Sequence, residues 1–414
     1  MQKRISIRGM HDLLGNSYDK QEKIIQEFVR LAELNNFFPI STPIMERNEV
    51  FSRGLGNSSD IVMKEMYSLK DKNDELLTLR PEGTAGIARA VLSNSLEQSL
   101  PLKFYYHGPM FRYERPQKGR LRQFNQLGVE IFSNGHYLDD ILGINFAYNF
   151  LRKLDISNNL ILSINTLGKV EERKNFIQVL KTFFKKRKND LSKDSIRRLE
   201  LNPLRILDSK DDNDKEVCKE APIIYDFLSQ NDLDYFEKIK QSLDAISIKY
   251  ITNPYLVRGL DYYNDTIFEF VLKNNRNFAV LAGGRYDNLV GQLGGKNLPG
   301  FGWAAGIERL RDLSDFSLKK SKAIVITSID ESNAHHAYKI ANILVNDNFK
   351  IDIFINNLKK ALKYSNKIHA SYTIILGDEE LKKESVGIKN MQSGEQQIVK
   401  IKNLQKYMRN YPQK

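Results

Sequence analysis

The spacing of apolar side chains changes several times along the chain, and each change predicts a different kind of element. Residues 17–36 place four apolar side chains on one stripe at helical spacing, which predicts an amphipathic helix. Pro39 and Pro43 follow it and predict extended chain. From about residue 102 to residue 132, apolar and polar residues alternate, which predicts strands of a half-buried sheet.

One strand near the end of this region alternates strictly. Leu127, Val129 and Ile131 share one face of it, and Gln126 and Glu130 share the other. We therefore expect these two polar side chains to point into the same space.

The middle of the chain has a different character. Residues 169–250 are heavily charged and helical in periodicity, with a basic run at 185–188. β-like sequence returns at 255–272 and again at 278–282. This order predicts a helical segment inserted between strands of one sheet.

The pattern changes once more after a predicted linker at 315–320. Two short apolar runs, 323–329 and 372–376, are typical of fully buried strands, and 350–354 is a third strand candidate. Amphipathic helices separate them, so the sequence predicts a small α/β domain of about 90 residues.

The overall composition excludes several classes of protein. The chain has 414 residues, of which 41% are apolar and 10% aromatic, which excludes wholesale disorder and allows two to four domains. No apolar run approaches a membrane span, and the first residues lack the apolar core of a secretory signal. The single cysteine, Cys218, cannot form an internal disulfide, which fits a reducing cytosol. These features predict a cytoplasmic protein.

The charge balance is basic. Lys and Arg total 63 against 51 Asp and Glu, which gives a net charge of +12. Residues 321–414 hold 15 of the basic and 9 of the acidic residues, so half of the excess lies in under a quarter of the chain. This excess fits a nucleic-acid partner, and it equally fits the solvated Lys-rich surface that A·T-rich genomes encode.

The densest candidate chemistry lies in residues 111–124, where five basic side chains occur within eleven positions. A basic loop between two antiparallel strands would aim several guanidinium groups into one space, and guanidinium forks bind phosphate oxygens. An exposed hairpin tip would have the same composition.

A second candidate is Arg258, which stands beside Gly259 in an apolar, β-like run. A buried arginine needs an anionic partner, which could be a ligand or Asp261. The pair Gly283 and Gly284 predicts a tight turn or a ligand that lies against bare backbone.

Two further stretches are typical of a junction between a strand or turn and a helix. Residues 300–310 are rich in Gly and Ala at such a junction, and Arg309 follows in the first helical turns. This suits a bound nucleotide or, alternatively, close helix–sheet packing with an exposed arginine. Residues 79–85 place Glu82 and Thr84 at a turn, where they would bind an ammonium group or cap a helix.

Together these stretches resemble the histidyl-tRNA synthetases, which are class II aminoacyl-tRNA synthetases, over nearly the whole chain and in the family's order. Residues 111–132 resemble class II motif 2, residues 306–310 resemble motif 3, and the region around Pro43 resembles motif 1. Residues 258–263 and 282–287 resemble the two histidine-specific motifs.

The resemblance continues outside these motifs. Residues 202–210 resemble the family's insertion domain, and residues 358–364 and 375–377 resemble its anticodon-binding domain. The implied fold is α+β, with a class II antiparallel-sheet catalytic core, a helical insertion and a C-terminal α/β anticodon-binding domain. The implied domains are a catalytic core over 1–168 and 251–318, a helical insertion domain over 169–250 and an anticodon-binding domain over 321–414.

The resemblance also implies an activity. It is the ATP-dependent attachment of L-histidine to tRNA(His) through a histidyl-adenylate, with release of AMP and pyrophosphate. ATP would enter as its Mg²⁺ complex, and the implied assembly is a homodimer away from any membrane. None of the six histidines falls in a metal-binding spacing, so no protein-bound metal is expected.

Roles for individual residues follow from the same resemblance. The residues implied to bind histidine are Glu82, Thr84 and Gln126 at the α-ammonium group, Glu130 and Tyr263 at the imidazole, and Tyr262 and Tyr286 along the pocket. Those implied to bind ATP are Arg112 at the α-phosphate, Arg309 at the γ-phosphate, Glu114 near the adenine or Mg²⁺, and Arg120 and Arg258. Arg115 and Gln117 are implied to meet the acceptor end of tRNA.

Arg112 and Arg258 are the implied catalytic residues. The histidine carboxylate would attack the α-phosphorus of ATP, and Arg258 would stabilise negative charge at the α-phosphate, where other class II enzymes place a metal. The step requires no covalent enzyme intermediate.

The chain departs from the family pattern in two places. His369 stands where the family commonly has glycine, and motif 1 is diverged around 35–42. Two other functions fit parts of this pattern. A non-charging regulatory subunit of histidine biosynthesis resembles this core but lacks the anticodon-binding module and departs at the histidine motifs. A simple tRNA-binding domain would not need a complete set of catalytic arginines.

Overall fold

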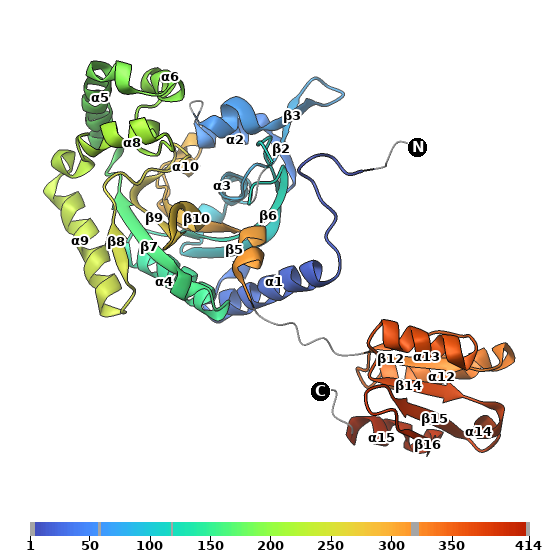
Figure 1. Cartoon of the computed structure of the whole chain (residues 1–414). Coiled ribbons are helices and arrows are strands. Elements are labelled where there is room, and N and C mark those ends of the chain that lie inside the picture. The colour runs from blue at the N-terminus through green and yellow to red at the C-terminus, as the bar shows by residue number, and fades with distance from the viewer. Residues whose placement is uncertain (1–4, 57–58, 117–118, 316–322, 411–414) are drawn as a thin grey trace. The chain divides into compact units, whose positions relative to one another are not determined.

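The computed structural model describes residues 5–56, 59–116, 119–315 and 323–410. The chain divides into two compact units, Met1–Phe316 and Ser317–Lys414, and each has its own hydrophobic core (Figure 1). The linker predicted at 315–320 lies almost wholly outside the described residues. No helix in the described part is long and apolar enough to span a membrane.

An eight-stranded sheet forms the base of the first unit, and it is antiparallel except for the outermost pair at each edge. Its strands, in spatial order, are β1 (Phe38–Pro39), β5 (Leu102–Phe111), β6 (Gln123–Phe132), β11 (Gly300–Gly306), β10 (Asn275–Arg285), β9 (Asn264–Leu272), β7 (Leu160–Thr166) and β8 (Tyr250–Thr252). β5 and β6 are the hairpin predicted for 102–132. The predicted antiparallel-sheet core is confirmed.

Helices cover one face of this sheet. They are α1 (Asn16–Leu34), which matches the predicted helix over 17–36, α4 (Tyr137–Lys153), α9 (Gln230–Ala245) and α11 (Ile307–Leu313). The ring of Phe28 packs against those of Phe146, Phe150 and Trp303, with centroids 5.8, 5.4 and 5.9 Å away. This aromatic core holds β6 and β11 from behind.

The polar side of β6 faces away from that core, because Leu127, Val129 and Ile131 are buried among the aromatic residues. Around this side lie a small three-stranded sheet and three short helices. These elements are β2 (Met45–Arg47), β4 (Leu76–Leu79), β3 (Tyr67–Lys70), α2 (Asn48–Leu55), α3 (Thr84–Ser93) and α10 (Leu289–Gln292).

The charged middle segment is helical, as its periodicity predicts. Between β7 and β8, which pair in the large sheet, it forms α5 (Val170–Lys186), α6 (Lys193–Leu201), α7 (Leu204–Leu207), α8 (Asp212–Lys219) and α9. The buried carboxylate of Asp214 accepts hydrogen bonds from the hydroxyls of Ser192, Ser195 and Ser209 at 2.6–2.7 Å. One side chain thereby ties α6 and the turn after α7 to α8.

The structure contradicts one sequence prediction about local structure and one of the two alternatives for the glycine pair. The β-like run from 255 contains no strand until β9 begins at Asn264. Its backbone is irregular, and adjacent side chains such as Tyr262 and Tyr263 are both buried, which explains the strand-like composition. The glycine pair forms no turn but lies within β10. A Cβ on Gly283 would stand 2.2 Å from the carbonyl oxygen of Gly302 in the neighbouring strand, so close strand packing requires glycine there.

The second unit has a five-stranded sheet of order β13 (Ile351–Ile353), β12 (Ile324–Ser328), β14 (Tyr372–Leu376), β15 (Ser385–Asn390) and β16 (Gln396–Lys400). Its helices are α12 (Ala334–Val345), α13 (Leu358–Lys367), α14 (Asp378–Lys382) and α15 (Leu404–Asn410). The three strands that the sequence predicts are present, and β12 pairs in parallel with both others. His369 lies just after α13 with φ of 54°, in the left-handed region that favours glycine.

Candidate active site

A cavity lies on the polar side of β6, where loops, two helix N-termini and three central strands of the large sheet meet. Its lining combines carboxylates, tyrosines and arginines. The predicted site residues that line it are Glu82, Thr84, Arg112, Glu114, Arg120, Gln126, Arg258, Tyr262, Tyr263 and Arg309.

Glu82 stands at the start of α3. Its carboxylate accepts hydrogen bonds from the main-chain N–H groups of Thr84 and Ala85, both at 2.8 Å. The capping role that the sequence left open is therefore present. Each oxygen keeps a second lone pair, so capping leaves room for a ligand cation. Burial raises the pKa of Glu82, against the effect of these donors, and a cation beside it would favour the charged form.

Glu130 is fully buried just behind the lining. Its Oε1 accepts a hydrogen bond from the Thr84 hydroxyl at 2.7 Å, and its other oxygen accepts one from the Tyr286 hydroxyl. A Cβ on Gly302 would stand only 1.8 Å from Glu130 Oε2, so the carboxylate lies directly over bare backbone. Burial raises the pKa of Glu130 well above its usual value, and an N–H donor or a cation beside it would favour the charged form.

Two polar atoms at this end of the cavity lack partners. Gln126 Oε1 and the Tyr106 hydroxyl are buried and accept or donate no hydrogen bond within the described residues. The rings of Tyr262 and Tyr263 lie 4.6 Å apart between centroids and are tilted by 50°. Acceptors, an aromatic wall and two carboxylates suit a small cationic or N–H-bearing ligand.

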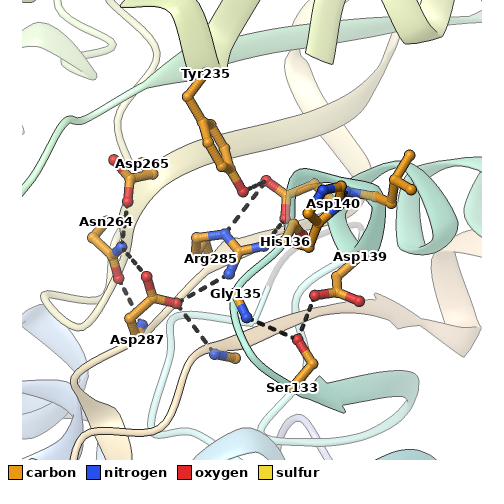
Figure 2. A network of polar contacts seen from close by, with 12 residues as sticks. Ser133, Gly135, His136, Asp139, Asp140, Tyr235, Asn264, Asp265, Arg285 and Asp287 are labelled. Atoms are coloured by element: carbon orange, nitrogen blue, oxygen red, sulfur yellow. Dashed lines mark hydrogen bonds and ion pairs between the residues drawn. The ribbon is translucent and has the colours of Figure 1, made fainter. Parts of the chain in front are cut away.

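A buried polar network surrounds the end of β10, next to Tyr286 (Figure 2). Arg285, which precedes Tyr286, forms an ion pair with Asp140 of α4, and both side chains are at most 2% exposed. Asp287 pairs with the same guanidinium at 3.2 Å, and the Tyr235 hydroxyl donates to Asp140 at 3.2 Å. The network fixes the end of β10, from which Tyr286 reaches Glu130.

Arg258 also lines the cavity. Its guanidinium pairs with Glu269 of β9 and lies 5.4 Å from the centroid of the Tyr263 ring. Asp261, the partner that the sequence left open, instead accepts a hydrogen bond from Asn202 at 3.0 Å. Burial opposes the charge of Arg258, but Glu269 and Tyr263 outweigh it and raise the pKa, so the guanidinium remains charged.

Two other arginines are held by main-chain carbonyl groups. Arg112 Nε donates to the carbonyl of Pro81 at 2.9 Å. Arg309 donates to the carbonyls of Gly119 at 3.0 Å and Ala279 at 2.6 Å. Carbonyl oxygens orient a guanidinium without neutralising it, so both keep a full charge for a ligand anion.

The fourth arginine of the cavity, Arg120, pairs with Glu114 at 3.1 Å. Burial and the nearby charge of Arg120 lower the pKa of Arg309, which shows that positive charge is concentrated here. An anion with several oxygens, such as a polyphosphate, would relieve this repulsion and use the fixed guanidinium groups bidentately.

The described structure thus brings together nearly all of the predicted histidine and ATP residues. Tyr286 and Glu130 stand behind the lining rather than on it. Arg115 is exposed on the β5–β6 loop, away from the lining, and Gln117 lies outside the described residues.

Comparison with known proteins gives the same picture across the chain. The family model for histidyl-tRNA synthetase matches residues 9–310, and the model for an anticodon binding domain matches residues 322–411. The chain belongs to the histidyl-tRNA synthetase family.

Similar members of the family align over nearly their whole length. A histidine–tRNA ligase of Gluconobacter oxydans is 42% identical over 399 residues, which cover 96% of each protein. One from a Wolbachia of Brugia malayi is 43% identical over 401 residues, or 96% of this chain and 97% of the relative. The crystal structure of apo S. aureus histidyl-tRNA synthetase matches with a TM-score of 0.80 and 31% identity, over 97% of this chain and 99% of that one.

Sequence reasoning about this histidyl-tRNA synthetase family member missed Glu269. The signal was available, because Glu269 is an acidic residue between Phe268 and Phe270 in the apolar second part of β9, residues 267–272. A buried carboxylate needs a cation, and Arg258 was a cation whose anionic partner the sequence left open. The Tyr106 hydroxyl carried no such signal, because tyrosine is ordinary in a strand.

Proposed function

We propose that this protein charges tRNA(His) with L-histidine in two steps, through a histidyl-adenylate, with release of pyrophosphate and then AMP. The observation that carries the proposal is one cavity with two chemically opposite ends. Buried carboxylates and tyrosines form one end, and four arginines form the other. An amino acid with a cationic ammonium group and a polyphosphate would therefore meet between them.

At the first end, the ammonium group of histidine would lie against Glu82, Thr84 and Gln126. The free Oε1 of Gln126 and the second lone pairs of Glu82 supply acceptors for its three N–H bonds. Glu130 and Tyr263 would bind the imidazole, with Tyr262 and Tyr286 along the pocket. An imidazole N–H directed at Glu130 would favour the ionised carboxylate that burial alone disfavours.

At the other end, ATP would bind as its Mg²⁺ complex, which we treat as substrate. Arg112 would contact the α-phosphate, Arg309 the γ-phosphate, and Arg120 and Glu114 the rest of the nucleotide. A histidine carboxylate oxygen would attack the α-phosphorus as the bond to the β-phosphate oxygen breaks and pyrophosphate leaves. Arg258, charged and fixed by Glu269, would stabilise the charge that grows on the α-phosphate.

In the second step, the 3′-hydroxyl of the terminal adenosine would attack the adenylate carbonyl carbon and expel AMP. Arg115, exposed on the β5–β6 loop, and Gln117 would meet the acceptor end of the tRNA. Residues 321–414, with their net charge of +6, would bind the anticodon. We take residues 1–168 and 251–318 as the catalytic core and 169–250 as the insertion domain.

We also propose a cytoplasmic homodimer. Large apolar side chains are exposed along β1 and along the small sheet that contains β2. Those more than 40% exposed are Phe38, Ile44, Met45, Leu69 and Leu76. Such clustering is typical of an interface between subunits. Sedimentation equilibrium should give twice the chain mass of 47.9 kDa, and a concentration-independent monomer would refute the dimer.

The proposed activity differs from that of a non-charging regulatory subunit. The match over 322–411 to an anticodon-binding domain and the intact motif over 258–263 support charging. The purified protein should exchange labelled pyrophosphate into ATP only with histidine and Mg²⁺ present. No exchange, or equal exchange with other amino acids, would refute the enzymatic role.

A further inference from the structure

The loop over residues 258–263 carries both Arg258 and Tyr263, but its backbone is irregular. Regular strands are held by ladders of main-chain hydrogen bonds, whereas such a loop depends on contacts from neighbouring elements. α5 and the turn between α6 and α7 lie next to this loop and contact it.

Tyr262 and Tyr263 of the loop share a hydrophobic core with Leu204 of α7, but this packing is interrupted beside the loop. A second cavity lies there, and its lining is largely apolar, including Leu167, Ile177, Leu204 and Leu260. Side chains that line this cavity make fewer contacts on that side than they would in a close-packed core, so packing holds the loop less firmly there. The polar contacts that cross between the helices and the loop therefore matter more than usual.

Asn202 makes one of these contacts. It follows α6, and its backbone is fixed because its N–H donates to Arg198 at 2.7 Å and its carbonyl accepts from Arg205 at 3.1 Å. Its side-chain Nδ2 donates to Asp261 Oδ1 at 3.0 Å. The Oδ1 of Asn202 is buried without a hydrogen-bond partner in the described part of the chain, so the amide engages the loop through Nδ2.

Arg173 makes another contact with the loop. It lies in the first turns of α5, and its Nη1 donates to the main-chain carbonyl of Tyr263. Burial lowers the pKa of Arg173, while Asp261 and Asp265 act in the opposite direction. A costly, half-buried guanidinium is thus used to hold one main-chain oxygen of the loop.

We propose that Asn202 and Arg173 are positioning residues for the adenylation step. From the helical segment they fix the loop at Asp261 and Tyr263, so that Arg258 faces the α-phosphate and Tyr263 faces the imidazole. The inference rests on the proposed function. It assigns to the segment over 169–250 a part in histidine activation, in addition to any contact with tRNA.

Histidine-dependent pyrophosphate exchange by the full chain tests this proposal. Asn202→Ala should lower kcat by about tenfold and change KM for histidine by less than about threefold, because a displaced Arg258 acts mainly in the transition state. Asn213→Ala is the matched control, since Asn213 is an exposed asparagine of the same segment. It should behave like the unmodified protein.

A double-mutant comparison separates positioning from general structural damage. In an Arg258→Ala background, Asn202→Ala should lower the remaining rate by less than about twofold, because its effect is transmitted through Arg258. The same factor in both backgrounds would overturn the proposal, and so would an unchanged kcat in Asn202→Ala. No exchange by the unmodified protein would instead refute the proposed function.

Arg173→Met provides a second route if Asn202→Ala does not fold, with the exposed Arg197→Met as its control. Because Arg173 holds Tyr263, this variant should raise KM for histidine by about tenfold while the protein remains folded. Unchanged kcat and KM in a folded Arg173→Met protein would contradict the role given to Arg173.

Discussion

The guanidinium of Arg258 illustrates how a single residue acquires a function. Burial alone would favour loss of its charge, yet Glu269 and Tyr263 raise its pKa and keep it cationic. Glu269 also fixes the direction of the fork, which a catalytic contact with a phosphate oxygen requires. Charge and direction thus come from a carboxylate that does not line the cavity.

Replacing either Arg258 or Glu269 should lower the rate of adenylate formation much more than the affinity for histidine. Arg258→Ala should lower the rate of adenylate formation about a hundredfold or more, with a much smaller effect on histidine affinity. Glu269→Gln keeps the shape of the side chain but removes its charge, so we expect a rate loss of about tenfold. Single-turnover adenylate formation and equilibrium histidine binding measure the two effects, and equal losses in both would contradict the account.

The sequence could predict which side chains share a strand face, but not which distant ones pair. Strict alternation places Gln126 and Glu130 on one side of β6, and the structure agrees. The pairing of Arg258 with Glu269 depends on an irregular loop, and no periodicity describes such a loop. The roles of Glu82, Tyr262 and Tyr263 at histidine came from resemblance and stay predictions.

Helices and strands with a regular spacing of apolar side chains could be predicted from the sequence. Segments whose backbone conformation depends on residues distant in the sequence could not. The apolar runs that became β12 and β14 are buried strands, as predicted. The run from 255 to 263 has strand-like composition because its side chains are buried, although its backbone is irregular. In the sequence Gly283 looks like a turn residue. The reason for glycine there is the Gly302 carbonyl of the neighbouring strand, which leaves no room for a Cβ, and this contact is visible only in the structure.

The end of α13 gives a prediction for backbone strain. His369 has φ of 54°, where a side chain is unfavourable and glycine is not. His369→Gly should therefore stabilise the second unit by about 0.5–1 kcal/mol, after allowance for the greater freedom of glycine in the unfolded chain. Urea unfolding measures this change. A loss of stability would show that the imidazole makes a contact that outweighs the strain.

The network of Figure 2 gives a prediction for pH. Burial, with Asp287 and Asp232 nearby, raises the pKa of Asp265 from 3.8 to about 6, against the effect of its bond from Asn264. The folded state therefore holds a proton that the unfolded chain releases. The stability that this group contributes is present below pH 4 and is lost as the pH rises through 6.

Asp265→Asn removes the titrating carboxyl group and with it the pH-dependent loss of stability. Asparagine also tolerates the observed φ of 44°. The free energy of unfolding of the variant, relative to the unmodified protein, should rise by about 1 kcal/mol between pH 5 and pH 8. Urea unfolding at both pH values measures it, with the exposed Asp194→Asn as control. The raised pKa would be contradicted if the free energies of unfolding of Asp265→Asn and of the unmodified protein changed by the same amount between pH 5 and pH 8.

At the scale of the whole molecule, the net charge of +12 divides into parts with different uses. Arg112, Arg120, Arg258 and Arg309 line one cavity, so their charge is not available to a large surface partner. The net +6 of residues 321–414 belongs to a separate compact unit with its own core. Net charge alone could not make this distinction, because it does not separate buried from exposed arginines.

Removal of residues 321–414 should therefore affect tRNA and not the small substrates. We expect histidine-dependent pyrophosphate exchange within about twofold of the full chain, because the first unit keeps its cores and its cavity. KM for tRNA should rise by at least about tenfold through the loss of phosphate contacts. A normal KM for tRNA in the truncated protein would contradict an anticodon-binding role.

The transfer of labelled histidine to tRNA(His) by the purified full chain tests the central claim most directly. The account predicts acid-precipitable histidyl-tRNA that forms only with ATP and Mg²⁺, and no comparable product with another amino acid or with tRNA of another specificity. Histidine-dependent exchange without any histidyl-tRNA, or charging of tRNA with a different amino acid, would contradict it.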